Sequence, residues 1–169
     1  DLEIEPAAMD DTAVIALSSG TTGVPKGVMH THRTLVASGR YGVKYMMADE
    51  NACGLNVFTT AFIGWYNCTL PFLYGGSKIV YLPEWSPAKV LATIAAEQVS
   101  VCFLVPTMWR AVLREVNDST DLSSLRRIGY AGEMMDRSTV MRLREEISPS
   151  IINTYGTTET GSWAGCTVM

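Results

Sequence analysis

The chain has 169 residues, of which 47% are hydrophobic and 18% are charged, so it has the composition of one globular domain and not of a disordered protein. Its formal net charge of −4 gives no electrostatic reason to expect a nucleic acid partner. The four cysteines are scattered without a C-x-x-C pair, and the acidic first residues do not resemble a secretory signal. We therefore expect a cytoplasmic protein with reduced cysteines.

Strand-like and helix-like stretches alternate along the chain. Apolar and β-branched runs predict strands at 13–17, 55–59, 78–82, 99–105, 127–131 and from 151 onward. Helical spacing predicts helices at 31–47, 62–73, 87–97, 107–116 and 138–147. Ser86 followed by Pro87 is a typical helix start. This alternation predicts an α/β fold with a mostly parallel sheet covered by helices.

The stretch from residue 51 to residue 77 contains no charged residue, which raises the question of a membrane span. It also contains Asn56, Asn67, Pro71 and the pair Gly75-Gly76, which do not suit a continuous apolar helix. We interpret it as a strand, a loop and a buried helix, and we expect no transmembrane segment.

A glycine-rich loop from Ser18 to Gly27 follows an apolar run that predicts a buried strand at 13–17. Glycines allow the backbone to approach a ligand closely, and backbone N–H groups, hydroxyls and a lysine suit phosphate oxygens. The order of residues around Lys26 matches neither the Walker loop nor the dinucleotide-binding fingerprint. The loop therefore predicts a polyphosphate site of another type, and a polar surface loop is the alternative.

A second constellation follows the last predicted strand, between Asn153 and Gly161. Tyr155 offers a flat face for a base, Thr158 offers a hydroxyl for a phosphate, and Glu159 offers an oxygen ligand for magnesium. A Tyr-Gly turn before a capped helix is the alternative. Both constellations, together with the segment 131–133, follow predicted strands. Because ligands bind at the carboxyl ends of parallel strands, we expect the three loops to meet around one nucleotide.

The two motifs resemble those of the adenylate-forming superfamily, which includes acyl-CoA synthetases, luciferases and the adenylation domains of peptide synthetases. The resemblance implies that Tyr155 stacks on adenine, that Thr158 contacts the α-phosphate, and that Glu159 holds magnesium. Lys26, Thr158 and Glu159 are thus the candidate catalytic residues. The candidate nucleotide-binding residues are Ser18, Ser19, Gly20, Thr21, Thr22, Gly23, Lys26, Ala131, Gly132, Glu133, Asn153, Thr154, Tyr155, Gly156, Thr157 and Thr158.

The resemblance also implies a reaction. ATP, with Mg²⁺, would activate a small carboxylic acid to an acyl-adenylate, and the thiol of coenzyme A would then take the acyl group. The family's acyl-pocket helix corresponds to Phe62, Ile63, Trp65 and Tyr66. Ile63 occupies the position of an aspartate in domains that activate amino acids, which disfavours an amino acid substrate. A peptide-synthetase domain, with a carrier-protein thiol, and a non-catalytic nucleotide-binding module are the alternatives.

Members of this superfamily run to several hundred residues, and the resemblance spans nearly all of residues 1–169. No ribose-binding motif and no second domain with a catalytic lysine follow Glu159 in this sequence. We therefore expect residues 1–169 to be one fragment of the AMP-binding N-terminal domain, without the C-terminal domain and inactive alone. The resemblance suggests a role in fatty acid metabolism, while the acid itself and the oligomeric state stay open.

Overall fold

The computed structural model describes residues 6–18, 24–148, 150–161 and 164–169. Within these residues the chain forms β1 (Thr12–Ser18), β2 (Lys26–Thr31), α1 (His32–Met46), β3 (Cys53–Asn56), α2 (Ile63–Gly75), β4 (Lys78–Tyr81), α3 (Pro87–Glu97), β5 (Val101–Leu104), α4 (Pro106–Val112), β6 (Arg127–Tyr130), α5 (Arg137–Glu146), β7 (Ile151–Tyr155) and β8 (Gly165–Val168). None of the helices in these ranges combines the length and apolar character that a membrane crossing needs.

The main sheet has the strand order β4-β3-β5-β6-β7-β8. Each neighbouring pair from β4 to β7 is parallel, and only β8 runs antiparallel to its neighbour β7. The predicted α/β fold with a mostly parallel sheet is therefore confirmed. The chain moves from β3 outward to β4 and then returns to β5 on the other side of β3, so the winding direction changes between β3 and β5. Such a switch point is where open α/β sheets bind ligands.

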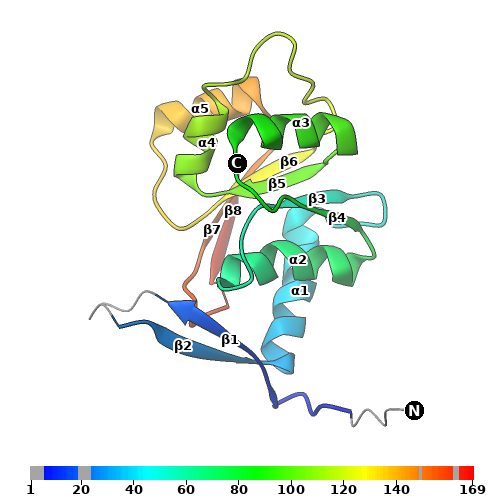
Figure 1. Cartoon of the computed structure of the whole chain (residues 1–169), viewed down its shortest axis with the longest axis vertical. Helices are drawn as coiled ribbons and strands as arrows, with labels where there is room; N and C mark the ends of the chain where they lie inside the picture. The colour runs from blue at the N-terminus through cyan, green and yellow to red at the C-terminus, as the bar shows by residue number, and fades with distance from the viewer. Residues whose placement is uncertain (1–5, 19–23, 149, 162–163) are drawn as a thin grey trace.

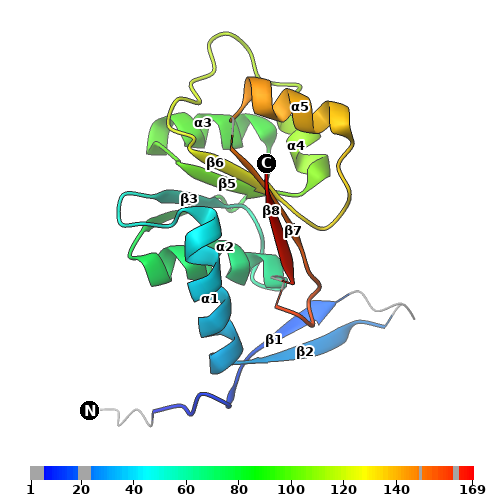
Figure 2. The same cartoon turned by 180° about the vertical axis from the view of Figure 1, so that it is seen from behind.

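Helices cover both faces of the sheet, and Figures 1 and 2 show α3, α4 and α5 on one face and α1 and α2 on the other. The alternation of side chains along β5 explains this arrangement, because successive residues point to opposite faces. Cys102 and Leu104 pack with α3, α4 and α5, while Val101 and Phe103 pack with α1 and α2. Both faces of the central strands are thus buried, as their continuous apolar sequence predicts.

The helix α3 begins at the predicted position. The Ser86 hydroxyl accepts a hydrogen bond from the Lys89 backbone N–H at 3.1 Å, and Pro87 occupies the first turn. Ser86→Ala is expected to lower the free energy of unfolding by about 1 kcal/mol, because one N–H at the helix start loses its partner. Urea denaturation followed by circular dichroism measures this change. Ser86→Asp retains a capping oxygen and should stay within about 0.5 kcal/mol of the parent; equal losses in both variants would contradict a capping role.

One predicted strand has a different environment from the one expected. The strand at 13–17 lies within β1, which pairs antiparallel with β2 in a separate two-stranded hairpin and not in the main sheet. Ala16 is buried, but Ile15 is 61% exposed and Leu17 is 47% exposed. The prediction of a buried strand was therefore wrong, because a two-stranded ribbon covers at most one of its own faces. Strands β2 and β8 were not predicted.

The hairpin is joined to the rest of the fold at a few points. The Leu17 N–H donates to the Ala61 carbonyl at 3.2 Å, between β3 and α2, and the His32 N–H donates to the Asp11 carbonyl at 3.2 Å. In both views the connection between β7 and β8 reaches the hairpin (Figures 1 and 2). The hairpin is thus placed next to the segment that follows β7, which contains the second predicted motif.

Candidate functional site

A pocket of about 270 Å³ opens at the carboxyl ends of the parallel strands. Its wall combines residues at or after the ends of β3, β5, β6 and β7 with one face of α2. The lining residues are Met46, Phe58, Ile63, Gly64, Asn67, Cys68, Phe103, Val105, Ala131, Gly132, Thr154, Gly156, Thr157 and Thr158. The pocket therefore lies at the switch point of the sheet, where a ligand can meet several loops at once.

Two of the three predicted loops meet at this edge of the main sheet. Ala131 and Gly132 follow β6, and Gly156 and Thr157 follow β7, in the same pocket wall. Gly132 has a φ of +94°, a conformation that side chains with a Cβ rarely adopt. The sharp turn that this glycine allows brings the chain after β6 across the end of β7.

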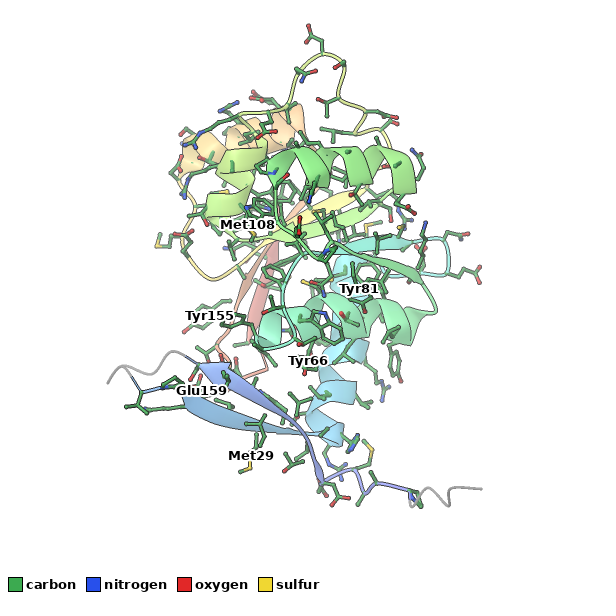
Figure 3. The ribbon with its side chains drawn as sticks, in the orientation of Figure 1. Met29, Tyr66, Tyr81, Met108, Tyr155 and Glu159 are labelled. Carbon is green, nitrogen blue, oxygen red and sulfur yellow. The ribbon has the colours of Figure 1, made fainter. Side chains whose placement is uncertain are left out.

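A second hollow of about 300 Å³ adjoins this wall, lined by Gly132, Glu133, Met134, Asn153, Thr154, Tyr155 and Gly156. Tyr155 is 73% exposed at the end of β7 (Figure 3). It forms one wall of this hollow, so its aromatic ring is available to contact a ligand there.

The Glu133 carboxylate has a structural partner. Its Oε1 atom accepts a hydrogen bond from the Thr107 backbone N–H at 3.2 Å, in the first turn of α4. A carboxylate near a helix N-terminus satisfies a free N–H group and opposes the positive end of the helix dipole. Glu133 thus ties the segment after β6 to α4 and holds the turn that forms the hollow.

The segment after β7 forms a compact turn rich in hydroxyls. The Thr157 N–H donates to the Thr160 Oγ1 atom at 2.9 Å, and that hydroxyl donates to the Thr157 carbonyl at 3.1 Å. The pKa of Glu159 lies below its ordinary value because the carboxylate accepts hydrogen bonds from its own backbone N–H and from Thr157, with smaller attractions to Lys26 and His30. Glu159 therefore stays ionised at neutral pH and faces the hairpin (Figure 3).

Lys26 approaches this carboxylate from the hairpin. It is the first residue of β2 and is paired in register with Ser18, the last residue of β1. Ser19, Gly20, Thr21, Thr22 and Gly23, predicted to bind phosphate, lie outside the described residues. Lys26 is close enough to Glu159, 133 positions later in the chain, to contribute to lowering the pKa of that carboxyl. The two ends of the predicted phosphate site therefore lie on the same side of the molecule.

The residues predicted for an acyl pocket separate into two groups. Ile63 lines the pocket at the ends of the strands, whereas Phe62 precedes α2 and is exposed. Trp65 stacks on Tyr81 with 5.7 Å between ring centroids and meets Tyr66 edge-on at 5.0 Å. Trp65 lines another hollow, near the end of β4. The structure therefore brings Ile63, but not Trp65 or Tyr66, to the wall shared with Thr154 and Gly156.

Sequence reasoning missed most of the apolar wall of the pocket. Asn67 and Cys68 lie one helical turn after Ile63 and Gly64, so the helical period starting from Ile63 was a signal that could have found them. Burial raises the pKa of the Cys68 thiol far above its ordinary value. Cys68 is therefore protonated at neutral pH and serves as a small apolar part of the wall and not as a nucleophile.

His30 lies near the ionised turn, on β2. It is buried, and its Nε2 atom has no hydrogen-bond partner among the described residues. With Glu159, Thr160 and Gly161 it lines a hollow of about 320 Å³ between the hairpin and α1. In the described ranges no group of three or more His, Cys, Asp and Glu side chains has a metal-binding arrangement. The carboxylate that suits a cation best here is Glu159, which would need phosphate oxygens to complete the coordination of magnesium.

Comparisons with known proteins agree with this geometry. The family model described as AMP-binding enzyme matches residues 1–169. The chain is 34% identical to a 3-hydroxybenzoate–CoA/4-hydroxybenzoate–CoA ligase of Thauera aromatica, over 92% of this chain and 29% of that protein. It is 31% identical to gramicidin S synthase 2 of Brevibacillus brevis, over 88% of this chain and 3% of that protein.

Solved structures show the same fold. The o-succinylbenzoate coenzyme A synthetase of Bacillus subtilis, in complex with ATP and magnesium ion, superposes with a TM-score of 0.83 at 28% identity. The match covers 98% of this chain and 35% of that one, so the chain spans only about a third or less of the length of the three relatives named here. Sequence, fold and the arrangement of the motifs agree, and the chain belongs to the family of AMP-binding enzymes.

Proposed function

We propose that this chain is the nucleotide-binding part of the N-terminal domain of a longer AMP-forming acid–thiol ligase (the parent protein), and that the C-terminal domain lies in the rest of that protein. The parent protein would activate a carboxylic acid with ATP and transfer the acyl group to coenzyme A. One observation carries this proposal: a single pocket is lined both by the apolar face of α2 and by the Gly156–Thr158 segment. An acid and a phosphate would therefore meet in one place.

The described residues have positions that suit this reaction. A carboxylate oxygen of the acid would attack the α-phosphorus of ATP, and the bond to the bridging oxygen would break so that pyrophosphate leaves. Tyr155 would hold the adenine beside the turn at Gly132, and Thr158 would donate a hydrogen bond to the α-phosphate. Lys26, with the glycine-rich loop before it, would offset the charge of the phosphates, an electrostatic role. Magnesium, held by Glu159 and phosphate oxygens, supplies further charge neutralisation when bound.

The thiol that takes the acyl group would come from outside this chain. Cys68, the cysteine in the pocket wall, is buried and its raised pKa keeps it protonated. Coenzyme A, which is part of the names of several relatives, fits this requirement. Its thiolate would attack the acyl carbon and release AMP. The four cysteines of the chain are unpaired, which supports a reducing compartment such as the cytoplasm.

A peptide-synthetase adenylation domain is the second candidate, and the 31% identity to gramicidin S synthase 2 favours it. An amino acid would bring an ammonium group into the pocket, where a carboxylate partner is expected because burying an unpaired charge is costly. The described residues of the pocket wall include no aspartate or glutamate. This composition favours an acid whose acyl group carries no charge. It therefore favours a coenzyme A ligase over a peptide-synthetase adenylation domain. A non-catalytic module is disfavoured because one pocket wall combines the face of α2, which suits an acyl group, with the Gly156–Thr158 segment, which suits a phosphate.

Exchange of labelled pyrophosphate into ATP tests the proposed function. With Mg²⁺ and a panel of small carboxylic acids, the parent protein is expected to catalyse exchange only when a suitable acid is present. Coenzyme A added afterwards should release AMP and form the thioester. The 169-residue chain alone is expected to show no acid-dependent exchange. A parent protein that supports no exchange with any acid or amino acid would refute the proposal, and exchange with amino acids alone would favour the rival.

A further inference from the structure

The helix α2 forms one wall of the pocket but has few local features that fix where it lies. Its N-cap residue is Phe62, which has no side-chain oxygen to accept a hydrogen bond from the first turn. Pro71 lies inside the helix and removes one of its backbone hydrogen bonds. Its apolar residues are spread around the helix and are not gathered on one face. The position of α2 therefore depends on contacts with the rest of the fold.

Asn56, the last residue of β3, provides such a contact. It is only 1% exposed. Its Nδ2 group donates to the Trp65 carbonyl and to the Thr69 Oγ1 atom of α2, both at 2.9 Å. Its Oδ1 atom accepts a hydrogen bond from the Phe58 backbone N–H at 2.9 Å. These partners determine the orientation of the amide, because a backbone N–H only donates and a carbonyl oxygen only accepts.

The hydrogen bonds of Asn56 reach two parts of the pocket wall. Phe58 lines the pocket, and Trp65 directly follows the wall residues Ile63 and Gly64. Phe58 also lines the hollow of about 470 Å³ near the end of β4, together with Asn56 and Trp65. The wall at Phe58 thus has open space on both sides, so packing alone leaves it room to shift. The hydrogen bond to Asn56 restricts that shift.

The far end of α2 is held by packing instead. The ring of Phe72 is buried on β3, where a Cβ added at Gly54 would lie 2.5 Å from a ring carbon. Gly54 and Asn56 are two residues apart, so they present the same face of β3 to the helix. Without the Asn56 hydrogen bonds, the pocket end of α2 can move while its far end stays packed at Phe72.

We propose that Asn56 is a positioning residue for the proposed reaction, which holds Phe58 and the first two turns of α2 in place against the Gly156–Thr158 segment. This inference rests on the proposed function. Asn56 acts through the pocket wall, and the wall in turn places the acid relative to the α-phosphate. A small displacement of one reactant from the other is costly in catalysis, so losing these hydrogen bonds should slow acid activation.

Kinetics of the parent protein can separate placement of the acid from binding of ATP. Pyrophosphate exchange is measured at varied ATP and with varied benzoate, acetate or hexanoate, and the acid that gives the highest rate is used. Asn56→Leu keeps the approximate size of the side chain and removes all three hydrogen bonds. It should raise the KM for the acid about tenfold and lower kcat/KM for the acid by about 10- to 100-fold. The KM for ATP should change by less than about threefold.

Ser100→Ala is the matched control, because Ser100 is also buried beside β3 but at its other end. Its Oγ atom accepts a hydrogen bond from the Cys53 N–H at 2.9 Å and donates to the Cys53 carbonyl at 3.3 Å. The variant loses buried hydrogen bonds and some stability, but both KM values should stay unchanged. A purely structural loss lowers the amount of active protein, and thus kcat, without a selective change in the KM for the acid.

Thr69→Val is a milder variant that removes one partner of Asn56, and it should raise the KM for the acid about threefold. A folded Asn56→Leu variant with an unchanged KM for the acid would overturn the proposal. If Asn56→Leu does not fold, Thr69→Val decides, and an unchanged KM for the acid then overturns it. Either result leaves the proposed function intact, whereas a parent protein without exchange with any acid would remove both.

Discussion

Replacing Glu159 by glutamine in the parent protein is expected to slow acid-dependent pyrophosphate exchange by about 100- to 1,000-fold, a loss of the size seen when one group that stabilises developing charge is removed. The substitution retains the size and shape of the side chain, removes its charge, and replaces one acceptor oxygen by an N–H donor. Lys26 and His30 would lose the carboxylate that attracts them, and magnesium would lose the protein ligand that we propose for it. Initial rates at several Mg²⁺ concentrations measure the effect, and the loss should shrink as Mg²⁺ rises.

Glu145→Gln provides the control, because Glu145 is an exposed glutamate on α5, away from the turn after β7. Its activity should match that of the unmodified protein. The lowered pKa of Glu159 also determines how activity should depend on pH. The group stays ionised as the pH falls below the ordinary glutamate range, so activity should not be lost through its protonation until still lower pH. Equal activity of the Glu159→Gln and Glu145→Gln variants would refute the role of the carboxylate.

Trp109→Ala is expected to lower the free energy of unfolding by about 3–5 kcal/mol, because it removes the largest fully buried side chain and leaves a cavity. Trp109 lies on α4 within the main core, and its Nε1–H donates to the Gly129 carbonyl of β6 at 2.8 Å. Trp109→Phe keeps much of the ring but leaves that buried carbonyl without this partner, and should cost about 1–3 kcal/mol. Urea denaturation of the parent protein measures both changes.

Trp85→Ala is the matched control, because Trp85 is 36% exposed. It separates the effect of losing a buried side chain from the effect of losing a tryptophan. Its loss should cost less than about 1 kcal/mol, the usual range for partly exposed positions. A cost for Trp109→Ala no greater than that for Trp85→Ala would contradict the structure of the core. The substitution at Trp109 should also weaken nucleotide binding, because β6 leads directly into Ala131 and Gly132 of the pocket wall.

The parallel strands of the main sheet could be predicted from the sequence, most clearly β5, which is buried on both faces and reads as an uninterrupted apolar run, whereas the edge strand β8 was missed. The segment 101–104 and the start of α3 at Ser86 show how much local pattern can determine. The same rule failed for β1, where an apolar run occurs in a ribbon with one face open. The partner strand β2 carries lysine, glycine and histidine among its apolar residues, and it gives no clear strand pattern.

The candidate site likewise has one part that the local sequence indicates and another that only the fold assembles. The glycine-rich loop and the segment from Tyr155 to Glu159 are continuous in sequence, so their residue types alone indicated phosphate chemistry. Met46, Asn67 and Phe103 come from three elements that meet because of the strand order around β3 and β5. Local spacing does not encode that order.

The separate hairpin has a consequence for how ligand binding would be detected. Ser18 and Lys26, at the two ends of the glycine-rich sequence, belong to a two-stranded ribbon, while Tyr155 and Thr158 belong to the main sheet and its following turn. Such a ribbon is marginal by itself and depends on the few contacts at Leu17 and His32. A nucleotide held at both places would join the two parts, so amide hydrogen exchange in β1 and β2 should slow on ATP binding, with little change in β5 and β6.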